Sequence, residues 1–320
     1  MPGVWVYAEL GPGGLQPSAL ELLTKARTLG GDVAAVALGP GATEAARSLG
    51  EHGATKVFAS DDAAFDEHLA RPAVHALAGL IEEHRPDLLL VPTSHDGRDV
   101  AGRLQGRIGS TLVSNASDVT ALDRVRMQIF GDTAEVEVAL EGPTPRLVLV
   151  RPHAFAAEPS GGTAEVVPVD AQIPDELKTA RRVERHEEQA SGPKLEEAKV
   201  VISGGRGLQD PKNFTLLDEL AQVIGSAAVG ATRAVVDAGW VPYSYQVGQT
   251  GKTVKPDVYL AFGISGATQH VVGMKAARRI VAINKDPEAP IFRLADLGVV
   301  GDALELLPKL TEEIRARRGG

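Results

Sequence analysis

Residues 257–279 read DVYLAFGISGATQHVVGMKAARR, and this run indicates the fold class. Its first part, DVYLAFGIS, is apolar and typical of a buried strand, whereas its second part, GATQHVVGMKAARR, is typical of a helix. The glycine-rich turn GISGA joins the two. A strand, a tight turn and a helix in this order predict one step of a parallel α/β sheet.

The same alternation runs through both halves of the chain. Strands are predicted in the first half at GVWVYAEL, DVAAVALG, KVFAS and DLLLVPTS, and helices at PSALELLTKARTL, ATEAARSLGEHG, FDEHLARPAVHALAGLIEEH and GRDVAGRLQGRIG. The third helix is expected to bend before Pro72. VRMQIFGDTAEVEVAL and RLVLVRP then alternate like antiparallel strands that could extend one edge of the sheet.

The second half restarts the alternation with the strand KVVISGG, the helix NFTLLDELAQVIG and the strand-to-helix unit AAVGATRAVVDAG. The strand RIVAINKD and the helix DALELLPKLTEEIRARR close it. We therefore predict an α/β fold of two doubly wound, Rossmann-like domains with largely parallel sheets.

Composition separates the two domains. Between residues 156 and 199, Pro, Gly and mixed charges replace the α/β alternation, as in KTARRVERHEEQASGPKLEEAK. We interpret about 156–199 as a linker whose charges are solvated, and place the boundary near residues 191–193. The expected domains are residues 1–190 and 198–320, which suits a length of 320 residues.

Charge and composition exclude several classes of protein. The net charge of −9 and the pI of about 5.4 disfavour a nucleic-acid binder. Without cysteine, the chain forms no disulfides, cysteine-ligated iron–sulfur clusters or thiol nucleophiles. The beginning, MPGVWVYAELGPGG, does not resemble a signal peptide, and no run of apolar residues suits a membrane-spanning helix. We expect a cytoplasmic protein that is not embedded in a membrane.

The loop GQTGKT, residues 248–253, resembles a phosphate-binding loop but departs from it. Gly251, Lys252 and Thr253 match the end of the motif, whereas Gln246 stands where the first glycine should be. Pro256 would also interrupt a helix that starts at Lys252. We therefore expect no triphosphate site here.

Two other enzymatic patterns also fail. GISGA resembles the nucleophile elbow of hydrolases, but no histidine after His270 could serve as the base in the required order. Ser265 is better interpreted as a helix cap that leaves N–H groups free for a ligand. The histidines show no metal-ligand spacing, so no metal site is expected.

Polar or glycine-rich turns follow the predicted strands of the second half: SGGRG, GATR, GISGATQH and INKD. In doubly wound sheets, ligands bind at the carboxyl ends of strands, where such turns converge. Arg206 adds a cation beside exposed N–H groups, which suits a pyrophosphate. The residues alone therefore predict a site for a dinucleotide, without showing which dinucleotide.

These turns together resemble the C-terminal signature of the electron-transfer flavoprotein alpha subunit. The resemblance rests on VISGGRGL, VGATRAVVDAGW, QVGQTGK, GISGATQH and AINKDPEAPIF, followed by LADLGVVGD, and spans residues 200–302. In the first half, VPTSHDGRDVAGRLQGRIG and LVSNASDV fit the same family more loosely.

The resemblance implies FAD held mainly by the C-terminal domain, and a beta-subunit partner in a heterodimer. It also implies an electron carrier with no substrate chemistry or catalytic residues of its own. Its electron donors would be acyl-CoA dehydrogenases, as in fatty acid oxidation, or other flavin dehydrogenases. A quinone oxidoreductase or another protein would accept the electrons.

The resemblance also implies FAD contacts. Arg206 would neutralise the pyrophosphate, and Arg233 would lie against the isoalloxazine ring. Thr232 stands where the family often has serine, and it keeps the hydroxyl. Gln249 and Thr250 would reach the polar edge of the flavin, with Thr250 near N5.

His270 would lie at the C2 carbonyl, and Asn284 and Asp302 would hold the adenosine end. The GQTGK loop would then be a flavin-edge loop. The full set of expected cofactor-binding residues is Arg206, Thr232, Arg233, Val247, Gly248, Gln249, Thr250, Ser265, Gly266, Ala267, Thr268, Gln269, His270, Asn284 and Asp302.

Two alternatives stay open at the level of the sequence. One is an NAD(P)-binding oxidoreductase domain, because the same sheet edge binds other dinucleotides. The other is a non-redox sensor that binds an adenine nucleotide. A yellow purified protein would favour FAD over both.

Overall fold

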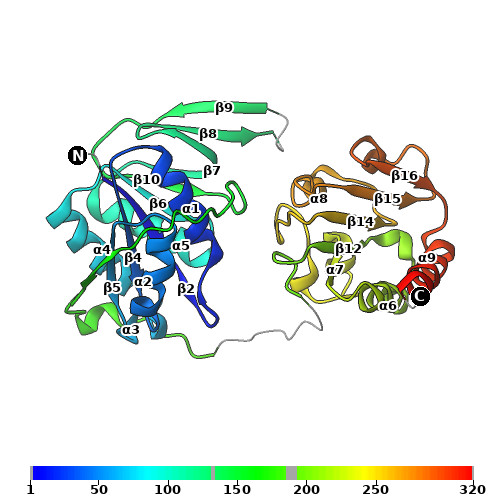
Figure 1. The fold of residues 1–320 in the computed structure, drawn as a ribbon, viewed down its shortest axis with the longest axis horizontal. Helices are drawn as coiled ribbons and strands as arrows, with labels where there is room; N and C mark the ends of the chain where they lie inside the picture. The colour runs from blue at the N-terminus through cyan, green and yellow to red at the C-terminus, as the bar shows by residue number, and fades with distance from the viewer. Residues whose placement is uncertain (1–2, 131–133, 185–192, 319–320) are drawn as a thin grey trace. The chain divides into compact units, whose positions relative to one another are not determined.

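The computed structural model describes residues 3–130, 134–184 and 193–318. The chain divides into two compact units, Met1–Arg185 and His186–Gly320 (Figure 1). The boundary predicted near residues 191–193 falls mainly outside the described residues and stays a prediction. Each unit is an α/β structure, so the predicted fold class is confirmed.

The described part of the N-terminal unit is built on a nine-stranded sheet, with the order β11-β5-β4-β1-β6-β10-β7-β8-β9. Strands from β11 to β7 run parallel to their neighbours, and β8 and β9 continue the sheet antiparallel. The strands are β1 Gly3–Ala8, β4 Asp32–Leu38, β5 Lys56–Ser60, β6 Leu88–Pro92, β7 Leu112–Ala121, β8 Arg124–Ile129, β9 Ala134–Ala139, β10 Arg146–Val150 and β11 Glu165–Pro168; a small ribbon pairs β2 Leu10–Gly11 with β3 Gly14–Leu15.

Helices cover both faces of this sheet. The residues of β1 alternate between two buried clusters, Val4 and Val6 facing one way and Trp5 the other, as the period of a strand requires. One cluster packs against α1 and α2, and the other against α4 and α5. The helices are α1 Pro17–Thr28, α2 Ala42–Glu51, α3 Ala64–Glu67, α4 Arg71–His84 and α5 His95–Ile108.

Two sequence-based expectations for this unit are wrong in detail. The sequence predicts β10 among the antiparallel edge strands, yet it lies parallel between β6 and β7. Its residues are buried along nearly the whole strand, which is typical of a central strand. The helix expected to end at His84 is not bent but divided into α3 and α4, since Ala70 takes a positive φ and Pro72 lies in the first turn of the second helix.

The linker expected over about 156–199 is wrong for its first part. Residues 165–168 form β11, which pairs with β5 at the edge of the sheet. Ser160 N donates to the carbonyl of Glu51 at 2.6 Å, and Leu69 N to that of Ala180 at 2.9 Å. Pro and Gly suggested a loop, but an edge strand tolerates such residues because only one of its sides is paired.

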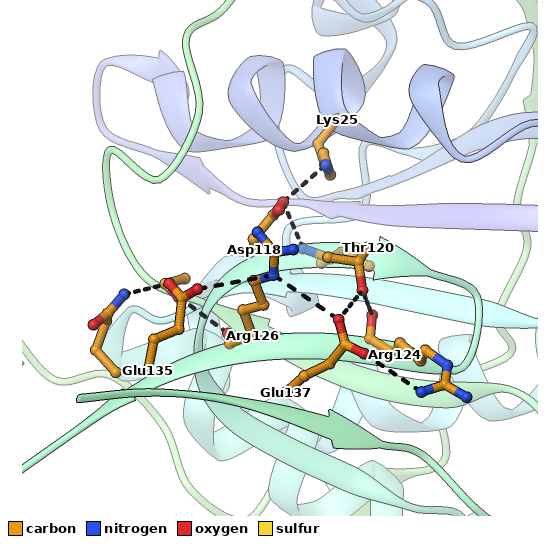
Figure 2. A network of polar contacts seen from close by, with 10 residues as sticks. Lys25, Asp118, Thr120, Arg124, Arg126, Glu135 and Glu137 are labelled. Carbon is orange, nitrogen blue, oxygen red and sulfur yellow. Dashed lines mark hydrogen bonds and ion pairs between the residues drawn. The ribbon is translucent and has the colours of Figure 1, made fainter.

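The antiparallel extension carries a network of charged side chains that Figure 2 shows from close by. Across β8 and β9, Arg124 Nη1 lies 3.4 Å from a Glu137 carboxylate oxygen, and Arg126 Nε lies 3.9 Å from Glu135. From α1, Lys25 Nζ reaches Asp118 on β7 at 2.8 Å. Opposite charges facing each other across a strand pair favour one register, so these pairs help to fix the hairpin.

The C-terminal unit contains a five-stranded parallel sheet with the order β13-β12-β14-β15-β16. One face packs against α6, α7 and α9, through residues such as Leu217, Val235 and Leu307. The other face is covered by connecting segments, which contribute Leu195, Val247 and other buried residues. The elements are β12 Val200–Gly204, α6 Thr215–Ile224, β13 Ala227–Ala231, α7 Arg233–Asp237, β14 Val258–Phe262, α8 Thr268–Val271, β15 Ile280–Asn284, β16 Leu297–Val300 and α9 Ala303–Arg318.

Among the described residues, no helix has both the length and the apolar character needed to cross a membrane.

Glu9 is a buried carboxyl group at the carboxyl end of β1, where the strand order of the N-terminal sheet reverses between β4 and β6. The Ser94 hydroxyl donates to it, and the same hydroxyl caps α5 by accepting from Gly97 N at 2.8 Å. Burial raises the pKa of Glu9 from 4.5 to about 7; the Ser94 hydrogen bond opposes this shift, and the nearby charge of Asp96 adds to it.

Glu9 should make the N-terminal unit less stable as pH rises. Its folded-state pKa is raised, so the stabilisation is complete below pH 4.5 and is lost as pH rises through about 7. The loss should reach at most about 3 kcal/mol, and Glu9→Gln should remove most of this slope. Trp5 fluorescence in a Trp240→Phe background would follow unfolding of this unit alone. A slope that is the same in the Glu9→Gln variant would contradict the assignment.

Candidate functional site

Parallel pairing brings the turns singled out in the sequence to one edge of the five-stranded sheet. β12 lies between β13 and β14, and β14 pairs with β15, all in parallel register (Figure 1). The carboxyl ends of these strands therefore carry Arg206, Arg233, the 264–269 segment and Asn284 side by side. Asp302 follows the next strand, β16, at the start of α9.

Two of these turns meet backbone against backbone. Gly205 N donates to the Phe262 carbonyl and Gly207 N to the Gly263 carbonyl, each at 3.0 Å. A Cβ atom on Gly207 would lie 2.5 Å from the Cα of Gly263, and Gly263 itself has a φ of +62°. Only glycine fits at both positions, so the turn after β12 is held directly against the turn after β14.

The 264–269 segment presents a run of unused backbone donors. Among the described residues, its N–H groups donate to no other group, whereas most of its carbonyls accept hydrogen bonds, namely those of Ile264, Ser265, Ala267, Thr268 and Gln269. Ile291 N donates to the Ser265 carbonyl at 3.0 Å, and Asn284 Nδ2 to the Ile264 carbonyl at 2.9 Å. The carbonyls thus fix the segment while Ser265, Ala267, Thr268 and Gln269 remain exposed.

The helix expected over residues 266–279 is wrong in length, and Ser265 is not its cap. α8 spans only Thr268–Val271, and Ala267 occupies the N-cap position. The reason lies in Gly273, whose carbonyl accepts from Val254 N at 2.8 Å and where an added Cβ atom would lie 2.4 Å from the backbone nitrogen of Gly248. The chain is therefore diverted into contact with a neighbouring loop instead of continuing as a helix.

Residues 247–252, here called the 247–252 loop, form a tight turn tied at both ends. Lys252 N donates to the Gln246 carbonyl at 2.7 Å, and Val247 and Lys252 form a bridge. The loop also contacts the 264–269 segment, because Gln249 N donates to the Gln269 carbonyl at 2.7 Å. The structure therefore brings Val247, Gly248, Gln249 and Thr250 next to the unused donors.

Thr250 is held by two side chains that precede the 247–252 loop. Gln246 Nε2 donates to its hydroxyl at 3.0 Å, and the Tyr243 hydroxyl donates to its carbonyl. Gln246 is buried, whereas Tyr243 is exposed. Thr250 is thus oriented by its neighbours.

His270 lies beneath the 247–252 loop, buried, with both ring nitrogens engaged. Nδ1 lies 3.0 Å from the Val247 carbonyl, and Nε2 lies 3.0 Å from the Tyr259 hydroxyl. A carbonyl can only accept, so Nδ1 carries the proton and Nε2 accepts from Tyr259. Burial lowers the pKa of His270 to about 4, while the hydrogen bond to Val247 opposes the shift. The ring is a neutral tie between β14 and the 247–252 loop.

The charged residues of the site lie at its exposed rim. Arg206 is exposed, and Arg233 Nε pairs with Asp237 at 3.1 Å, with about 60% of each side chain exposed. Thr232 is the N-cap residue of α7, although its hydroxyl makes no capping bond there. Lys285 Nζ lies 2.8 Å from Asp302, and this pairing, together with the Leu304 N–H, lowers the pKa of the Asp302 carboxyl.

Sequence reasoning missed Tyr259 and Lys285, which hold His270 and Asp302 respectively. The phenol of Tyr259 stands inside an otherwise apolar strand, and such a residue needs a buried hydrogen-bond partner. The need of this phenol for a buried partner is the sequence signal that could have identified Tyr259. Within residues 3–130, 134–184 and 193–318, no group of three His, Asp or Glu side chains is placed to bind a metal.

Comparisons with known proteins match both units. Residues 194–275 match the model for the electron transfer flavoprotein FAD-binding domain, and residues 4–174 match the electron transfer flavoprotein domain. The chain is 44% identical over 320 residues to electron transfer flavoprotein subunit alpha of Mycobacterium tuberculosis, covering 100% of both chains. The proteins of the same name from Megasphaera elsdenii and Bacillus subtilis are each 36% identical, with 99% and 98% of this chain and 97% of each relative covered.

His270 should make the C-terminal unit less stable as pH falls. Its folded-state pKa is lowered, so its contribution is complete above pH 6.5 and is lost as pH falls through about 4. We expect a loss of up to roughly 3 kcal/mol, the reverse of the trend for the N-terminal unit. Imidazole ¹⁵N NMR should show the Nδ1–H tautomer at pH 6. A cationic His270 ring at that pH would contradict this account.

Proposed function

Because the chain belongs to the electron transfer flavoprotein alpha-subunit family, we propose that it binds FAD at the carboxyl edge of β12–β15 and carries electrons. The observation that supports this most strongly is the coincidence of two findings. The FAD-binding domain model covers residues 194–275, and the same residues carry the run of unused N–H donors at 264–269. Electron carriage also fits the names of the relatives.

The donors at this edge suit the pyrophosphate of a dinucleotide. Backbone N–H groups that point outward from a strand-to-helix turn bind phosphate oxygens, and an adjacent guanidinium strengthens the binding. Residues 264–269 and Arg206 supply these two features. We propose that Asn284 and Asp302 hold the adenosine end, where Lys285 keeps the Asp302 carboxyl ionised.

We propose that the isoalloxazine end of FAD lies at the same edge of the sheet, against the start of α7 and the 247–252 loop. Arg233 and Thr232 begin α7, and Val247 to Thr250 form the adjoining loop. We propose that Arg233 stacks on the ring and that Gln249 and Thr250 approach its polar edge. The resemblance places His270 at the C2 carbonyl of the flavin, but both of its ring nitrogens already have partners, so we propose that it acts instead by fixing Val247.

FAD, when bound, supplies the redox chemistry, and the protein binds, orients and tunes it. A guanidinium beside the ring favours the reduced cofactor, because reduction adds negative charge there. The glycine-rich turns keep side chains from covering the backbone donors. Each of these residues therefore acts by position and charge.

We propose a beta-subunit partner in a heterodimer, as the family name implies. The donors would be flavin dehydrogenases, acyl-CoA dehydrogenases among them, and the acceptor a quinone oxidoreductase or another redox protein. A cytoplasmic location and the lack of nucleic-acid binding stay predictions from the sequence.

The chain co-expressed with its beta subunit should be yellow and elute as a one-to-one complex. Nucleotide released by denaturation should be FAD, at about one per alpha subunit when chromatographed against FAD, FMN and NAD(P) standards. Recovery of NAD(P), or of a colourless complex with an adenine nucleotide alone, would instead support one of the two alternatives.

Arg233→Ala should lower the one-electron reduction potential of the bound FAD. A charge pair near 4 Å is worth roughly 4 kcal/mol at an effective dielectric of about 20, and solvent should reduce this to about 1–3 kcal/mol. That range corresponds to roughly 40–130 mV. Asp237→Asn, which frees the guanidinium from its partner, should shift the potential upward.

Redox titration of the complex measures both shifts. Arg317→Ala on α9 is the matched control, since it also removes an exposed arginine that pairs with an acidic neighbour. Identical potentials for wild type and Arg233→Ala would show that Arg233 is only a surface ion-pair residue.

A further inference from the structure

Lys252 has no role in the proposed FAD contacts, yet it is paired rather than freely solvated. Its Nζ lies 2.9 Å from Glu196 Oε2, and the two side chains are 31% and 38% exposed. Glu196 is 56 residues away in sequence. This ion pair therefore joins two separate segments of the C-terminal unit.

The backbone that carries Glu196 is held in a fixed position. Its neighbour Leu195 is buried with 5% exposure, in the same apolar cluster as Val247 and Val201. The backbone around Glu196 is also closed by a turn, in which Ala198 N donates to the Lys194 carbonyl at 3.0 Å. A carboxylate on an anchored segment loses less freedom on pairing than one on a mobile chain.

The ion pair adds a third interaction that holds the 247–252 loop in place. His270 holds Val247 from below, and Tyr243 and Gln246 hold Thr250 from the preceding segment. Lys252 ends the loop, and its backbone bonds to Gln246 as its side chain reaches Glu196. Without the pair, the end of the loop would keep only its backbone ties to the turn.

We propose that Lys252 is a positioning residue. Its ion pair with Glu196 fixes the conformation of the 247–252 loop, and this holds Gln249 and Thr250 in place to contact the cofactor. This inference rests on the proposed function for the identity of the cofactor. It assigns the lysine of the GQTGK motif to an ion pair with the segment that enters the unit, instead of to a phosphate.

Charge reversal tests the pair. Glu196→Lys and Lys252→Glu each place like charges together, and each should speed amide hydrogen exchange in the 247–252 loop. FAD binding should weaken by about two- to fivefold in each, the size of effect a partly exposed ion pair can have. The double variant Glu196→Lys, Lys252→Glu restores an attractive pair and should return both quantities to near the wild-type values.

The double variant also separates positioning from direct electrostatics. If the charge of Lys252 acted on FAD itself, glutamate at 252 would weaken binding with or without the change at 196. Glu313→Lys is the control, because it breaks the exposed Glu313–Arg317 pair on α9, 2.7 Å apart, and should alter neither quantity.

The experiment uses the full chain, with and without its partner and FAD. Unchanged exchange in the single variants, or failure of the double variant to recover, would overturn the inference. Absence of FAD from the wild-type complex would overturn the proposed function. Exchange in the FAD-free chain measures the ion pair independently of that result.

Discussion

The contact between Gly207 and Gly263 is the constraint on which the C-terminal site depends. It places the backbone after β12 against the backbone after β14, and a side chain at either position would separate them. Because Gly263 N also donates to the Ile283 carbonyl at 2.9 Å, the same contact reaches β15. The turns of three neighbouring strands are thus joined through their main chains, and the 264–269 segment is fixed with its N–H groups free.

The two faces of the five-stranded sheet serve different purposes. Helices α6, α7 and α9 seal one face with apolar side chains, as in many α/β units. Connecting segments seal the other, and among them Tyr259 and His270 form a buried polar tie to the 247–252 loop. An unpaired buried polar group is costly, so this tie favours one loop conformation over others that would break it.

Much of this structure could be predicted from the sequence, because the α/β alternation and the glycine-rich turns are local signals. The strands β1, β4, β5, β6, β12, β14 and β15 follow from short apolar runs. What failed depends on distant partners. β10 becomes a central parallel strand through β6 and β7, β11 becomes an edge strand through β5, and α8 ends early because Gly273 is used by Val254 and Gly248. For the site, the candidate residues could be proposed from motif spacing and family resemblance. The hydrogen bond between His270 and Tyr259 could not, because it depends on how the fold brings the two residues together.

Amide hydrogen exchange of the complex with and without FAD tests the proposed FAD site at the carboxyl edge of β12–β15 most directly. The N–H groups of residues 264–269 are unused in the described chain, so FAD binding should slow their exchange, together with that of Arg206 in the adjoining turn. The sheet of the N-terminal unit should be unaffected. Protection that appears instead at the carboxyl ends of β1 and β6, with no change at 264–269, would contradict the account.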